Sequence, residues 1–156
     1  VGRPDSTDPE IVSAYVLGRW RQAVGSRALR RLPAFLETTR AQARRHLDAL
    51  RALPGVTVFD DAPGTQGTWP FLLLTMPDTG SRDAALATLW TAGLGVSRLF
   101  IHALPDYAYL RDIVPAAELP QARDFAARSL TITNSPWLRD DEFMRIVERL
   151  REVLRA

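Results

Sequence analysis

The residues best suited to chemistry gather in one irregular stretch, from Gly95 to Pro115, where hydrophobic periodicity fails. Its composition shifts to aromatic residues, arginine, histidine and proline, which is typical of an ordered loop. Three side chains in it can recognise a ligand: Arg98, His102 and Tyr107. An imidazole titrates near neutral pH, and a guanidinium can bind a phosphate or carboxylate through two parallel hydrogen bonds. For each of the three, backbone contacts or ordinary packing are the alternative to a binding role.

The chain lacks the side chains on which several kinds of catalysis depend. All 20 of its lysine-or-arginine positions are arginine, and cysteine is absent. Schiff-base chemistry on a lysine amine, thiolate catalysis and zinc–cysteine sites are therefore excluded within these residues. Asp140, Asp141 and Glu142 form an acidic run, but they lie at an expected helix start, where the helix dipole accounts for them. We predict no catalytic, cofactor-binding or metal-binding residue in this chain.

Two groups of arginines raise the possibility of nucleic-acid binding; they are Arg27, Arg30 and Arg31, then Arg40, Arg44 and Arg45. The net charge is only +2, and neither a recognition helix nor interleaved aromatic residues accompany the groups. We interpret them as solvated helix faces and expect His46, which follows the second group, on the same kind of surface.

No apolar run approaches the roughly 18 residues needed to cross a bilayer. The first residues, 1–6, also lack the basic and apolar regions of a signal peptide. We therefore expect a cytoplasmic protein without membrane contact. A length of 156 residues suits one domain, with a helical part at 1–54 and a small mixed part at 55–156.

Hydrophobic periodicity and turn residues predict an α+β fold. Helices are expected at 8–24, 27–53, 82–92, 115–128 and from 140 onward, and strands at 56–59, 69–76 and 129–133. The first helix should end at Gly25, and Pro33 should kink the second or begin a fresh one. Ser81 is expected to cap the helix over 82–92. The strand over 69–76 is apolar on both faces, as a strand covered on both sides would be.

From Val56 onward, the order and spacing of short motifs resemble the end of a DegT/StrS family aminotransferase. A tryptophan-led strand over 68–73 precedes a helix that carries the Arg-Asp-x-x-Leu pattern at Arg82, Asp83 and Leu86. The segment 101–107, Ile-His-Ala-Leu-Pro-Asp-Tyr, is similar to the family loop with its His, Pro and Tyr. Residues 115–118, 129–133 and 140–147 resemble the helix start, strand and terminal helix that follow.

Two departures accompany this resemblance. The strand ending at Thr133 lacks the family's usual proline, and the upstream stretch lacks an Asn-x-Arg pair that reaches the partner subunit's cofactor. Residues 3–6, Arg-Pro-Asp-Ser, are at most a degenerate remnant of that pair.

The resemblance implies the small carboxy-terminal domain of a fold-type-I enzyme, with a small antiparallel-type sheet covered by helices. The parent enzyme would use pyridoxal phosphate on a lysine of a large domain that is missing here, to transfer an amino group to a keto-sugar, free or nucleotide-linked. His102, Tyr107 and Arg98 would contact that substrate, and the helices would help to build a homodimer. The alternative is a stand-alone, non-catalytic binding or regulatory module that keeps this fold.

Overall fold

The computed structural model describes residues 18–156, and the chain divides into two units, residues 1–37 and 38–156. Helix α2 (Arg19–Arg51) contains both Gly25 and Pro33, so the expected helix end at Gly25 is wrong. A glycine inside a helix costs only about 1 kcal/mol relative to alanine, and the good helix formers around it outweigh that cost. The earlier part of the helix expected at 8–24 lies outside the described residues.

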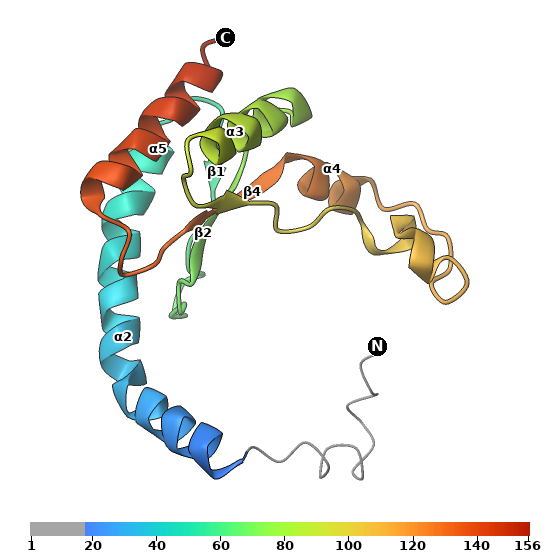
Figure 1. Ribbon diagram of the computed structural model, residues 1–156. Coiled ribbons are helices and arrows are strands. Elements are labelled where there is room, and N and C mark those ends of the chain that lie inside the picture. Colours follow the sequence, from blue (N-terminus) through green and yellow to red (C-terminus); the bar gives the residue numbers. More distant parts are fainter. Residues whose placement is uncertain (1–17) are drawn as a thin grey trace. The chain divides into compact units, whose positions relative to one another are not determined.

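The unit over 38–156 is built on a four-stranded antiparallel sheet with the order β1-β2-β4-β3 (Figure 1). Its strands are β1 (Thr57–Val58), β2 (Phe71–Thr75), β3 (Val96–Ser97) and β4 (Ser129–Thr133). The three expected strands are confirmed, and the pairing of Leu72 and Val96 with Ile132 sets the register around β4. The fold class expected from the sequence is therefore correct.

One face of this sheet carries the core. Alternate residues of β2 and β4 point to it, and Leu72, Leu74, Leu130 and Ile132 are fully buried there. Apolar stripes of α2, α3 (Thr79–Thr91) and α5 (Asp140–Val153) supply the other side of the core cluster. Figure 1 shows α3 beside α5, as the apolar stripe of the last helix requires.

The other face of the sheet is only partly covered, which contradicts the expectation that β2 is covered on both sides. Phe71 is 37% exposed and Leu73 is half-buried. A hollow of about 300 Å³ lies there, lined by Pro70, Phe71, Gly95, Val96, Ser97, Thr131 and Thr133. All of the residues that line this hollow belong to strands or to the segments beside them.

Two helix starts differ from expectation because other residues provide the better terminus. Asp78, not Ser81, is the N-cap of α3, and its carboxylate accepts hydrogen bonds from the backbone N–H of Ser81 at 2.8 Å and from its hydroxyl at 2.9 Å. Helix α4 (Pro120–Arg128) begins five residues later than expected, with Pro120 in the first turn, where a missing N–H costs nothing.

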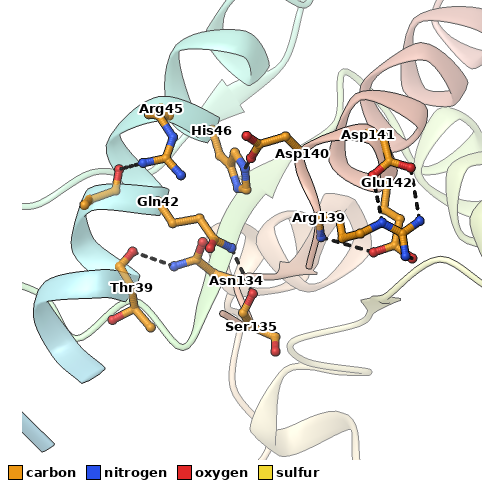
Figure 2. Close-up of polar contacts among 11 residues, drawn as sticks. Thr39, Gln42, Arg45, His46, Asn134, Ser135, Arg139, Asp140, Asp141 and Glu142 are labelled. Carbon is orange, nitrogen blue, oxygen red and sulfur yellow. Dashed lines mark hydrogen bonds and ion pairs between the residues drawn. The ribbon is translucent and has the colours of Figure 1, made fainter. Parts of the chain in front are cut away.

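Buried polar side chains join α2 to the turn before α5 (Figure 2). The Asn134 amide donates to the carbonyl oxygens of Thr39 at 2.9 Å and Trp69 at 2.8 Å, and the Gln42 amide donates to that of Ser135 at 2.9 Å. These bonds give the N–H groups of the buried Asn134 and Gln42 amides their acceptors. They fix the turn from which α5 starts.

His46 belongs to the interior, so the expectation of a surface histidine is wrong. The residue is 3% exposed, and its ring stacks on that of Phe143 in α5, with ring centroids 3.6 Å apart. Nε2 lies 3.7 Å from the Asp140 carboxylate, and Figure 2 shows Asp140 at the start of α5 facing the ring. Burial outweighs the attraction of Asp140 and lowers the pKa of His46.

Candidate functional site

The candidate site is the loop over residues 98–119, between β3 and α4, which Figure 1 shows extending beyond α4. Its only regular structure is two 3₁₀ turns, η1 (Leu104–Asp106) and η2 (Ala108–Leu110). Pro105 sets the first turn, and backbone hydrogen bonds from Asp106 to Ala103 and from Leu110 to Tyr107, both 3.0 Å, close the two. The loop is thus ordered by local turns.

The structure brings two of the three expected site residues together. The rings of His102 and Tyr107 lie 5.3 Å apart, nearly perpendicular, and the Tyr107 and Tyr109 rings lie 5.4 Å apart. Edge-to-face packing of this kind is favourable, because the ring edge is positive and the ring face is negative. His102 is exposed and Tyr107 is half-buried, so the imidazole is accessible while the phenol supports it.

Arg98, the third residue, is held elsewhere. Its Nη2 donates to the Asp83 carboxylate of α3 at 3.1 Å, and the same oxygen accepts from Arg82 Nε at 2.8 Å. Arg82 is buried, and its Nη1 also donates to the carbonyl oxygen of Ala126 at 3.1 Å. Within the described residues, no hydrogen bond, ion pair or ring contact joins Arg98 to His102 or Tyr107. The first residue of the loop is therefore tied to α3.

A second ion pair holds the middle of the loop, and the sequence did not point to it. Arg123 of α4 donates from Nε and Nη2 to the two carboxylate oxygens of Asp106, each at 2.9 Å. The hydrogen bonds from Arg123 hold the pKa of the Asp106 carboxyl below its usual range, so the pair stays charged at neutral pH. No local pattern marks this pair, because its members are 17 residues apart across irregular chain.

Two arginines of the second group line a hollow that lies away from this loop. It measures about 360 Å³, and its lining includes Arg40, Arg44, Asp60, Asp61 and Trp69. Arg40 Nε donates to the carbonyl oxygen of Gly67 at 2.8 Å, and Arg45 Nη1 donates to that of Ala41 at 3.4 Å. The Arg40 guanidinium therefore ties α2 to the segment before β2, whereas the Arg45 bond is an exposed contact within α2. Among the described helices, none has the length and apolar character of a membrane span.

Comparison with known proteins agrees with this architecture. The model of the DegT/DnrJ/EryC1/StrS aminotransferase family matches residues 14–151. A curated relative is the dTDP-3-amino-3,4,6-trideoxy-alpha-D-glucose transaminase of Streptomyces venezuelae, which is 28% identical over 115 residues. That match covers 72% of this chain and 29% of the relative.

Solved structures are similar over nearly the whole chain. DesV of S. venezuelae, solved in complex with a ketimine intermediate, has a TM-score of 0.75 at 23% identity, covering 86% of this chain and 36% of DesV. The aminotransferase TlmJ of Streptoalloteichus hindustanus has a TM-score of 0.68 at 26% identity, covering 85% and 35%. PseC of Helicobacter pylori, an aminotransferase involved in pseudaminic acid biosynthesis, has a TM-score of 0.74 at 14% identity, covering 85% and 36%. The chain spans about a third of the length of these proteins.

Proposed function

Because the chain belongs to the DegT/DnrJ/EryC1/StrS aminotransferase family, we propose that it is the small-domain portion of a cytoplasmic sugar aminotransferase. The parent enzyme transfers an amino group from glutamate or glutamine to a keto-sugar, and we favour a nucleotide-linked one. The observation that carries this proposal is the family match over residues 14–151 of a chain that spans about a third of its relatives.

The chain's own residues do not fit a covalent site for pyridoxal phosphate, the cofactor of this family. That cofactor needs a lysine amine, and the chain contains only arginine among its lysine-or-arginine residues. We therefore place the lysine and the cofactor in a large domain outside these 156 residues. The chain alone is inactive in amino transfer.

In this proposal the loop over 98–119 faces the substrate. His102 is accessible to a sugar hydroxyl or phosphate, and Tyr107 packs against it. Arg98 already donates one nitrogen to Asp83, which leaves the rest of its guanidinium for a phosphate oxygen. The loop also exposes apolar side chains, namely Phe100, Ile101, Leu104, Tyr109 and Ile113, which supports its burial against the rest of the enzyme.

Self-association is the second part of the proposal. The described start of α2 exposes apolar side chains: Trp20, Val24, Leu29, Leu32 and Phe35, with Trp20 at 79%. Exposed apolar surface of this extent supports a homodimer built with this helix. Light scattering over a dilution series measures it: a falling mass on dilution supports the dimer, and a monomer at every concentration contradicts it.

The function itself is tested on the complete polypeptide that contains this chain. Amino transfer from glutamate or glutamine to a dTDP-linked keto-sugar should be detectable, and His102→Gln and Tyr107→Phe should raise KM for the sugar. If the complete polypeptide carries no lysine-bearing large domain and transfers no amino group, the stand-alone binding module replaces this proposal. A complete enzyme in which both variants retain the wild-type KM keeps the family function and refutes the site.

A further inference from the structure

The loop over 98–119 has few means of holding its shape. It contributes no residue to the buried core cluster, and its regular structure is confined to η1 and η2. Ala103 is buried and the Phe100 ring lies 6.2 Å from that of Phe125, but most of the loop's large apolar side chains are exposed, so burial fixes little of its conformation. Its specific polar contacts therefore decide how its residues are placed.

One guanidinium makes most of those contacts. Besides the two hydrogen bonds to Asp106, Arg123 Nη2 donates to the carbonyl oxygen of Ala117 at 3.1 Å, and Nη1 lies 3.4 Å from the Glu118 carboxylate. The Arg123 side chain thereby joins η1, the end of the loop and α4. A two-pronged arginine–carboxylate pair fixes orientation as well as distance, which a lysine could not reproduce.

Asp106 stands between the two candidate substrate residues. Its backbone N–H closes η1 on Ala103, the neighbour of His102, and its carbonyl leads into Tyr107. The His102 and Tyr107 rings are in contact across this turn. Holding the Asp106 carboxylate therefore holds the turn that presents both rings.

We propose that Arg123 and Asp106 are positioning residues, whose ion pair sets the placement of His102 against Tyr107. This inference rests on the proposed function in assigning those two rings to the substrate. Neither member of the ion pair belongs to the core cluster, and the Asp106 carboxylate lies close enough to His102 for the two to interact electrostatically. The side chains of the pair are 39% and 32% exposed, and ion pairs at such sites contribute little to global stability. The effect of the pair is local order in the loop.

The test uses the full 156-residue chain and the variants Arg123→Gln, Arg123→Lys and Asp106→Asn. Native-state hydrogen exchange of the Asp106 and Leu110 amides should become about tenfold faster in Arg123→Gln and Asp106→Asn, because the loop opens locally without global unfolding. The nuclear Overhauser contact between the His102 and Tyr107 rings should weaken in the same variants. Arg123→Lys keeps the charge but cannot form the two parallel hydrogen bonds to Asp106. The exchange rates of the loop amides in this variant should therefore fall between those of wild type and Arg123→Gln.

Arg149→Gln is the matched control, since it breaks another exposed arginine–carboxylate pair, with Glu152 on α5. It should leave the loop amides and the ring contact unchanged. Exchange in Arg123→Gln equal to that of wild type, or equally raised in Arg149→Gln, would overturn the positioning role.

Steady-state kinetics of the complete enzyme test the positioning role and the proposed function separately. If Arg123→Gln loosens the loop and also raises KM for the nucleotide sugar with kcat little changed, both inferences stand. If the loop loosens and KM is unaffected, the positioning role stands and the substrate contact of His102 and Tyr107 is wrong.

Discussion

The strand β4 and the loop over 98–119 are separated in the sequence only by α4, yet different interactions determine their conformations. In β4, Leu130 and Ile132 are fully buried and pair with β2, so each residue is constrained by packing and by the sheet. In the loop, Ile101 and Ile113 are exposed, and two ion pairs and two short turns set the path. Residues of β4 therefore determine whether the unit folds, whereas residues of the loop determine which side chains it exposes for binding.

The largest difference in stability is expected when an isoleucine is replaced by alanine in each of the two regions. Ile132→Ala removes buried methyl groups at the centre of the sheet and should lower the free energy of unfolding by about 2–5 kcal/mol. Ile101→Ala removes the same atoms from a side chain that is 56% exposed, and should change it by no more than about 0.5 kcal/mol. Urea unfolding followed by circular dichroism measures both. Equal losses would mean that the loop belongs to the cooperative core.

Two arginines that share one carboxylate give the next contrast. Arg82→Met leaves the carbonyl oxygen of Ala126 buried without its donor, which should cost roughly 1–3 kcal/mol. Arg98→Met removes only an exposed contact with the same Asp83 oxygen, so the cost should stay within about 0.5 kcal/mol. The same unfolding experiment decides. A larger loss in Arg98→Met would show that the loop, rather than α3, depends on Asp83.

The buried histidine of α2, His46, provides a pH-dependent test of the packed region. Burial holds the pKa of His46 below its ordinary value of 6.5, so the unfolded chain binds the proton more readily than the folded one. The stability that depends on neutral His46 is complete above that value and is lost as pH falls below it. The charged groups acting on the ring are Asp140 of α5, which opposes the shift, and Arg45 of α2, which adds to it.

Between about pH 7 and pH 5.5, wild type should lose stability, and His46→Leu should lose much less. Thermal unfolding midpoints across that range measure the slopes. Parallel slopes in wild type and His46→Leu would contradict this assignment, since another group would then be responsible.

The same contrast explains which features the sequence could predict. The stripe of Phe143, Ile146 and Leu150 and the strand over 129–133 follow from periodicity, because burial imposes a regular spacing on the residues it selects. The neighbouring Arg45 favours a surface position for His46, but Ala43, His46, Leu47 and Leu50 have the spacing of one buried helix face. That signal was present in the sequence.

Other features left no such signal. The strand β3 has only two residues, and its pairing with β4 depends on the finished sheet. The partners of Arg98 and Arg123 come from distant positions, so neither ion pair has a local pattern. Family resemblance implied that His102 and Tyr107 serve one substrate, and that contact stays a prediction; the packing of their rings comes from the structure alone.

The smallest contrast concerns two aspartates, one at a helix start and one in the loop. Asp78 caps α3 and accepts hydrogen bonds from the backbone N–H and the hydroxyl of Ser81. Both bonds lower the pKa of Asp78, and the bond from the backbone N–H has the larger effect. Asp78→Ala removes both bonds and should lower the unfolding midpoint by about 2–5 °C at neutral pH. In the described part of the chain, Asp112 forms no hydrogen bond or ion pair, so Asp112→Ala should leave the midpoint unchanged.

Because the pKa of Asp78 is lower in the folded chain than in the unfolded one, its contribution to stability is present above the ordinary value of 3.8 and is lost as pH falls below it. Wild type and Asp78→Ala should therefore converge in acid. Ser81→Ala removes only the hydroxyl bond and should lie between them at neutral pH. A Ser81→Ala loss larger than that of Asp78→Ala would restore Ser81 as the cap and show that the start of α3 is set as the sequence alone suggested.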